Sequence, residues 1–138
     1  MRKEEEWPVH DQVVDAVATQ RMNYPSENHP NSQTYTNPDQ EKNFFVNGDN
    51  KVWPDLVVID TKRKAVIIIG EVETESTVNN ESAEQWKDYS TRSGDFYLYV
   101  PHGYEDEAKR LLNLNGIRCS GIRTYWFENS HVKFAEVK

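Results

Sequence analysis

The sequence predicts a single α/β domain with a central mixed β-sheet and helices on both faces of that sheet. Two β-branched runs, VVI at 57–59 and AVIII at 65–69, flank a polar stretch and are typical of a β-hairpin. Both runs are apolar at every position, so we expect helices to cover both sides. Helix-like periodicity then alternates with a strand-like run at 96–100, which indicates a crossover to a parallel strand.

Composition limits the classes of protein that fit this chain. Its 138 residues are enough for one domain with a core, and its net charge is −7. No apolar run approaches the roughly 20 residues of a membrane span, and no signal peptide is evident, so we expect no membrane segment and a cytoplasmic location. Cys119 is the sole cysteine, which excludes an internal disulfide and a cysteine-based zinc site.

The first segment, residues 1–22, is typical of a leading helix. Acidic residues near its start suit the positive end of a helix dipole: Glu4, Glu5, Glu6 and Asp11. The expected apolar stripe consists of Val9, Val13, Val14, Val17 and Ala18. Residues 23–43 are rich in Asn, Pro, Ser and Thr and predict a polar loop. A short strand at 44–46 and a turn at 47–50 then lead into the hairpin.

The second half is expected to alternate helices and strands. A helix over 81–92, capped by Asn79 or Asn80, would bury Ala83, Trp86 and Tyr89 or Ser90. After the strand at 96–100, a helix at 104–114 should end before Asn115-Gly116. Its apolar side comprises Ala108, Leu111, Leu112 and Leu114. One or two strands within 117–127 and an edge strand at 131–137 complete the chain.

Three carboxylates lie where the hairpin should carry buried side chains. Because side chains alternate faces along a strand, Asp55 shares a face with Ile59, and Glu71 and Glu73 share a face with Ile67. A five-residue loop would place Ile59 opposite Ile67 and Asp55 opposite Glu71. Like charges directly opposite each other are destabilising unless a cation lies between them. Oxygen ligands of this kind favour Mg²⁺ or Mn²⁺.

Pro54-Asp55, followed on the next strand by Glu71-Val72-Glu73, resembles the PD-(D/E)xK nuclease superfamily. That superfamily includes restriction endonucleases, Holliday-junction resolvases and repair nucleases. Glu73 stands where the motif has Lys, as in a minority of active restriction enzymes that carry E-x-E. The resemblance spans roughly residues 10–100 and implies a restriction-endonuclease-like core of helix, three-strand meander, helix and strand, to which the C-terminal helix and strands are added.

The resemblance also implies a site and a reaction. Asp55, Glu71 and the backbone carbonyl of Val72 would hold Mg²⁺ (or Mn²⁺), and the reaction would be phosphodiester hydrolysis by an endonuclease or exonuclease. Glu73 would orient or deprotonate the attacking water, or bind a second ion. An acid from the first helix could join the site. Gln85 and Lys87 on the following helix are further candidates, with Lys87 as the cation missing at 73, although a solvated surface lysine is the simpler interpretation.

The expected partner of a nuclease is nucleic acid, in particular DNA, and a homodimer is a second expected possibility.

Two alternatives to an active nuclease are left open by the sequence. The net charge of −7 counts against phosphate binding. That charge and the absent Lys favour a nuclease-fold domain without catalysis, which would serve as a binding or assembly module. The second alternative is an unrelated α/β domain whose acids lie at strand ends by chance.

Overall fold

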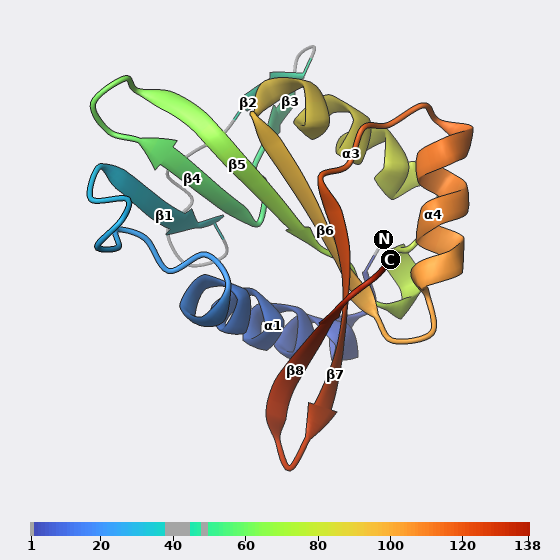
Figure 1. The fold of residues 1–138 in the computed structure, drawn as a ribbon. Coiled ribbons are helices and arrows are strands. Elements are labelled where there is room, and N and C mark those ends of the chain that lie inside the picture. The colour runs from blue at the N-terminus through green and yellow to red at the C-terminus, as the bar shows by residue number, and fades with distance from the viewer. Residues whose placement is uncertain (1, 38–44, 48–49) are drawn as a thin grey trace.

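The computed structural model describes residues 2–37, 45–47 and 50–138 and shows a central six-stranded sheet flanked by helices (Figure 1). The helical elements are η1 (Glu4–Glu6), α1 (Trp7–Gln20), η2 (Glu75–Thr77), α3 (Asn80–Arg92) and α4 (Glu105–Leu114). The strands are β1 (Ser32–Thr36), β2 (Phe45–Asn47), β3 (Asn50–Val52), β4 (Leu56–Asp60), β5 (Ala65–Val72), β6 (Asp95–Pro101), β7 (Gly121–Glu128) and β8 (His131–Glu136).

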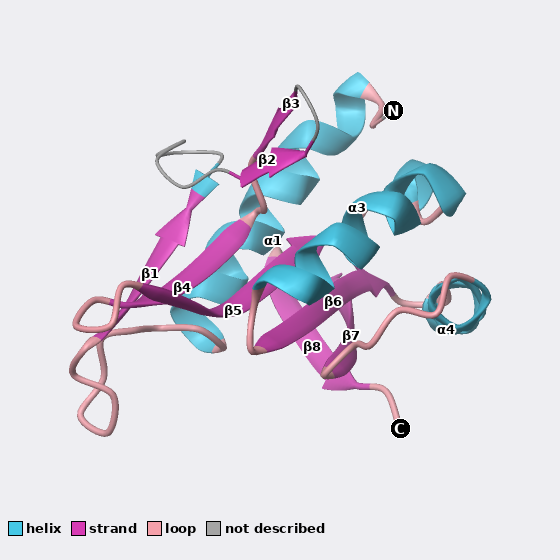
Figure 2. Ribbon diagram, turned by 90° about the horizontal axis from the view of Figure 1, so that it is seen from above, coloured by secondary structure: helices cyan, strands magenta, loops and turns pink. Residues whose placement is uncertain are grey.

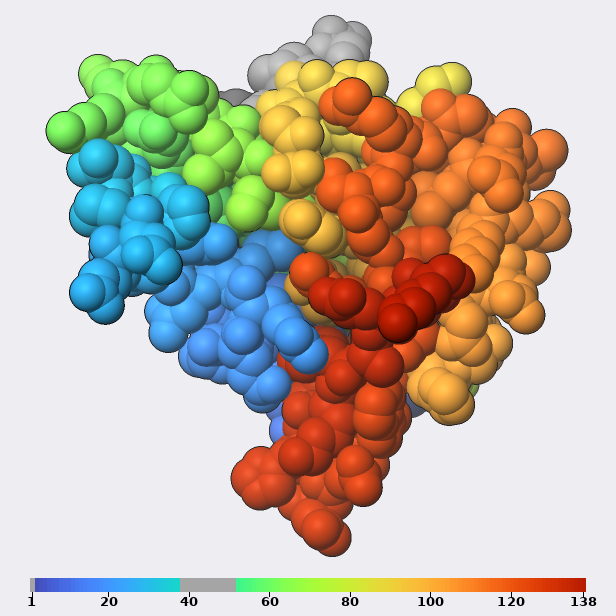
Figure 3. All heavy atoms as spheres, in the orientation of Figure 1, coloured from blue at the N-terminus to red at the C-terminus, as the bar shows by residue number. Residues whose placement is uncertain are grey.

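The central sheet is mixed, as predicted, and has the strand order β1-β4-β5-β6-β7-β8. β1, β4 and β5 form an antiparallel meander. α3 then crosses over to β6, which is parallel to β5, and α4 leads to β7, which is parallel to β6. β8 returns antiparallel to β7, and this hairpin projects beyond the rest of the molecule (Figure 3).

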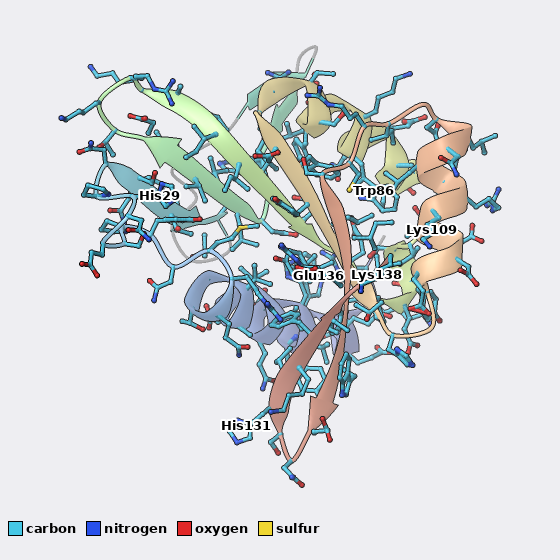
Figure 4. The ribbon with its side chains drawn as sticks, in the orientation of Figure 1. His29, Trp86, Lys109, His131, Glu136 and Lys138 are labelled. Atoms are coloured by element: carbon cyan, nitrogen blue, oxygen red, sulfur yellow. The ribbon has the colours of Figure 1, made fainter. Side chains whose placement is uncertain are left out.

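Helices cover both faces of the sheet, which confirms the prediction drawn from its apolar strands. On one face α1 contributes Val13, Val14 and Val17 to a cluster that includes Leu56 and Val58 of β4. On the other face α3 and α4 pack against β5 and β6 (Figure 2). Trp86 of α3 is fully buried in that second cluster (Figure 4). Beyond the end of β5, Glu6 of η1 accepts hydrogen bonds from Thr74 and from Ser76 of η2, which ties the start of the chain to this point.

The register of the hairpin differs from the expected one at its loop end. Val57 pairs with Ile69, but a bulge between Val58 and Ile59 shifts the register, so that Ile59 pairs with Val66 and not with Ile67. A bulge adds one unpaired residue to one strand and leaves the pairing beyond it intact. Leu56 pairs with Gly70, so the expected juxtaposition of the residues before β4 and at the end of β5 is retained.

The prediction of an unstructured polar loop over 23–43 is wrong for β1. Its residues SQTYT pair along β4, from Ser32 opposite Asp60 to Thr36 opposite Leu56. An edge strand of half-buried polar side chains lacks the apolar pattern on which the prediction depended. The strand predicted at 44–46 corresponds to β2, which pairs only with β3 in a separate two-stranded sheet. Residues 38–44 and 48–49 lie outside the described part.

Both outer helices differ from prediction at one position of the buried stripe. Val9 is 36% exposed and His10 is buried in its place, at 1%. Leu114 is 65% exposed, because α4 ends there and the chain turns away through Gly116, which has a positive φ of 62°. The α3 cap is as expected, since the Asn79 side chain accepts a hydrogen bond from the Ser82 N–H. Among the described helices, none combines the length and hydropathy of a membrane span.

Candidate carboxylate site

Asp55 and Glu71 are interlocked at the open end of the β4–β5 pair. The Asp55 N–H donates to Glu71 Oε1 at 2.8 Å, and the Val72 N–H donates to Asp55 Oδ2 at 2.9 Å. Each carboxylate therefore caps the backbone of the neighbouring strand where regular pairing stops. The sequence predicted that these two side chains would be neighbours, and the structure brings them together.

Glu73 lies two residues beyond Glu71 and is almost fully buried, at 2% exposure. Its Oε2 accepts a hydrogen bond from the Trp86 indole at 2.6 Å, and its Oε1 is 3.0 Å from Arg2 Nη2. The Glu73 N–H donates to the Tyr99 carbonyl, which ties the residue to β6. Both carboxylate oxygens are thus engaged by other side chains rather than open to the interlocked Asp55 and Glu71.

His10 is a member of the site that the sequence analysis did not identify. Its Nδ1 is 3.0 Å from Asp11 Oδ1, and its Nε2 is 3.0 Å from Asp55 Oδ1. The second contact lacks hydrogen-bond geometry, so Nε2 remains a buried polar atom without a hydrogen-bond partner in the described part of the chain. A signal existed, because positions 10, 13, 14 and 17 have the i, i+3, i+4, i+7 spacing of a buried helix face.

Arg2 is the second residue that the sequence analysis missed. Its Nε donates to Thr74 Oγ1 at 3.1 Å, and its Nη2 lies 3.1 Å from the Val72 carbonyl and 3.0 Å from Glu73 Oε1. The guanidinium also lies 5.0 Å from the centre of the Trp7 ring, a cation–π distance. Its side chain is 12% exposed. No local pattern marks this residue, because its hydrogen-bond partners are Val72, Glu73, Thr74 and Thr77, which are distant in sequence.

The pKa values of the two buried carboxylates, Glu71 and Glu73, are raised above their ordinary values. Burial, followed by the neighbouring Asp55 and Glu73 carboxylates, holds the pKa of Glu71 well above its ordinary value. Burial also raises the pKa of Glu73 to about 7, although the Trp86 hydrogen bond lowers it. Burial opposes a charge on His10, but the adjacent Asp55 carboxylate outweighs burial and raises the pKa of His10.

The other predicted site residues lie elsewhere. Gln85 and Lys87 are exposed on α3, on either side of the inward-facing Trp86, and within the described residues neither bonds to the three carboxylates. Of the acids at the start of the chain, Glu6 accepts hydrogen bonds from Thr74 and Ser76 instead of facing Asp55. Burial opposes a charge on Glu6, but the hydrogen bonds from Ser76 and Thr74 outweigh burial and lower the pKa of Glu6.

The donor set suits a small divalent cation, although no cage of three side chains is already formed among the described residues. Carboxylate and carbonyl oxygens could come from Asp55, Glu71 and Val72, and the buried Nε2 of His10 lies beside Asp55. Adjacent ligands of an octahedral ion at about 2.1 Å lie roughly 3 Å apart. The 3.0 Å between His10 Nε2 and Asp55 Oδ1 fits that spacing.

Comparison with known proteins does not assign the chain to a family. No protein-family model, curated protein or solved structure matches it.

Proposed function

We propose that this chain is a metal-dependent phosphodiesterase of the restriction-endonuclease-like type, acting on nucleic acid and in particular on DNA. The order of elements supports this proposal. α1, the antiparallel meander β1-β4-β5, α3 and the parallel strand β6 follow the helix, three-strand meander, helix and strand of that core. The first strand of the meander is β1, and not the segment at 44–46.

The observation that carries the proposal is the interlock of Asp55 and Glu71 at the end of β4 and β5. The buried Glu71 carboxylate and the partly exposed Asp55 carboxylate face one another across adjacent strands, and burial together with the Asp55 charge raises the pKa of Glu71. Carboxylates needed only to cap strands would be satisfied at lower cost by neutral amides. A divalent cation would supply positive charge there and use the same oxygens.

The proposed roles follow from the contacts. Asp55, Glu71 and the Val72 carbonyl would hold Mg²⁺ or Mn²⁺, and His10 Nε2 would add a nitrogen ligand. A bound ion would polarise the scissile phosphate and lower the pKa of a coordinated water. Glu73 has both oxygens engaged by Trp86 and Arg2, so it would act by holding Arg2 at the site rather than as a free base.

Isosteric substitutions test this function. Asp55→Asn and Glu71→Gln keep the oxygens that accept from Val72 N–H and Asp55 N–H, but they remove the charges. We expect each to abolish Mg²⁺- or Mn²⁺-dependent cleavage, measured on plasmid, single-stranded, flapped and branched DNA, while the far-UV circular dichroism spectrum stays unchanged. Asp106→Asn on the exposed side of α4 is the matched control and should retain full activity. Cleavage that persists in both site variants would refute the proposal.

A second function is favoured by one specific contact set. Arg2 and His10 already lie beside Glu73 and Asp55, so the carboxylates are partly neutralised without any metal. A nuclease-fold domain without catalysis, serving as a binding or assembly module, would need no more than this. It predicts no cleavage of any DNA or RNA and no change in melting temperature with Mg²⁺ or Mn²⁺.

A further inference from the structure

We propose that Arg2 is the resident counter-ion of the carboxylate site and that a divalent cation must compete with it. This inference rests on the proposed metal site at Asp55, Glu71 and Val72. It assigns to Arg2 a regulatory role, because the guanidinium would set the metal concentration at which the site fills.

The contacts place Arg2 on one group that a metal would use and on a neighbouring carboxylate. Its Nη2 is 3.1 Å from the Val72 carbonyl oxygen, a proposed ligand, and 3.0 Å from Glu73 Oε1. Thr74 and Thr77 accept further hydrogen bonds from the same guanidinium, at 3.1 and 3.3 Å. The side chain is thus held at the end of β5 by acceptors that fix its orientation.

The segment that carries Arg2 is itself fastened beside the site. Glu6 accepts hydrogen bonds from the Thr74 hydroxyl at 2.7 Å and from the Ser76 N–H at 3.3 Å. Trp7 lies under the guanidinium, with 5.0 Å between the Arg2 Cζ and the ring centre. Both ends of the segment from Arg2 to Trp7 are therefore attached near the carboxylates, which keeps the positive charge close to them.

The Arg2 guanidinium and a divalent metal ion would compete because their positive charges repel each other. The Arg2 guanidinium lies 3.1 Å from the Val72 carbonyl, a proposed metal ligand, and 3.0 Å from the Glu73 carboxylate, so its positive charge is next to the proposed metal site. A second cation that used the Val72 carbonyl would be repelled by that charge, and the repulsion is stronger at a buried site, where the effective dielectric constant is lower. Arg2 would therefore weaken metal binding while stabilising the metal-free protein.

The test is Mn²⁺ binding, measured by titration calorimetry on the metal-free protein at pH 8.5 and low ionic strength. Arg2→Gln and Arg2→Met remove the charge in two different ways, so one variant suffices if the other does not fold. We expect each to bind Mn²⁺ at least about fivefold more tightly than the wild type, and the difference to shrink at 1 M salt.

Two further variants separate charge from structure. Arg2→Lys keeps the charge and should bind Mn²⁺ nearly as the wild type does. Arg63→Gln removes an exposed guanidinium, 72% accessible on the hairpin loop, and should change nothing. Without metal, the neutral Arg2 variants should also melt at a lower temperature than the wild type. Adding Mn²⁺ should raise their melting temperature by more than it raises that of the wild type. A merely structural arginine would lower the melting temperature and leave the Mn²⁺ dissociation constant unchanged.

Each outcome decides one of the two proposals. Unchanged or weaker Mn²⁺ binding in the neutral variants, or no binding by any form of the protein, overturns the competition. If the wild type cleaves DNA but the neutral variants bind Mn²⁺ no better, the proposed function stands and this inference fails. If they bind Mn²⁺ more tightly but no form cleaves a nucleic acid, this inference stands and the nuclease function fails.

Discussion

Trp86 connects Glu73 to the helix α3 through a hydrogen bond. The indole is fully buried, and its Nε1 lies 2.6 Å from Glu73 Oε2. Trp86→Phe would remove the donor and leave a buried carboxylate oxygen short of a partner. We expect the free energy of unfolding, measured by urea denaturation, to fall by about 1–3 kcal/mol from the lost hydrogen bond. The smaller ring would add a packing loss.

Trp126 provides the matched control for this substitution. Its Nε1 also donates to a carboxylate, Glu128 Oε2 at 3.2 Å, but on the exposed side of β7. Trp126→Phe should change the unfolding free energy by no more than about 0.5 kcal/mol, because water can replace the lost donor. Equal losses in the two variants would show that the Glu73 bond contributes nothing specific to stability.

At the residue level, sequence patterns could predict one contact of the site, between Asp55 and Glu71, but not the contacts of His10 and Arg2. Asp55 and Glu71 could be predicted as neighbours because strand alternation and hairpin pairing connect residues close in sequence. His10 was visible only as a member of a helical stripe, with nothing to say which carboxylate it meets. The contacts of Arg2 could not be predicted, because they depend on how η1 and α1 dock against η2.

Two leucines on the apolar side of α4 differ strongly in burial. Leu111 is 1% exposed and packs in the cluster beneath α3 and α4, whereas Leu114 at the last turn is 65% exposed. Leu111→Ala should therefore lower the free energy of unfolding by about 2–5 kcal/mol, by lost burial and the cavity left behind. Thermal or urea unfolding followed by circular dichroism measures the change.

Leu114→Ala is the control on the same helix with the same change of side chain. We expect an effect smaller than about 0.5 kcal/mol, since little apolar surface is lost. A large loss in this variant would mean that Leu114 is covered in solution. The sequence pattern places both leucines on the apolar side, and only the position of the helix end distinguishes them.

Two strand features escaped prediction for the same physical reason. β1 is polar and takes its place from backbone hydrogen bonding to β4, which any sequence can provide. The bulge at Val58 and Ile59 changes the register without changing the apolar pattern of either strand. Hydrophobic periodicity reports which face is buried, so it predicts the buried hairpin and the helices but not an edge strand or a bulge.

Residues from both helical layers and from the central hairpin meet at the carboxylate site. α1 contributes His10, the central hairpin contributes Asp55 and Glu71, and α3 contributes Trp86, so the two apolar clusters meet at one polar point. The net charge of −7 includes the acids gathered there. A ligand that binds this point would connect both layers, and its binding energy would add to the stability of the entire fold.

Metal binding should therefore raise the free energy of unfolding of the whole chain. With free Mn²⁺ at 100 times its dissociation constant, mass action predicts a gain of about 2.7 kcal/mol, measured by urea denaturation with and without the ion. His10→Gln removes the buried imidazole nitrogen while filling similar space. If His10 is a ligand, this variant binds Mn²⁺ more weakly, so the gain at the same Mn²⁺ concentration falls. An undiminished gain in stability would mean that Nε2 of His10 takes no part in binding the ion. The control variant Asp106→Asn, on the exposed side of α4, should be stabilised by Mn²⁺ as much as the wild type is.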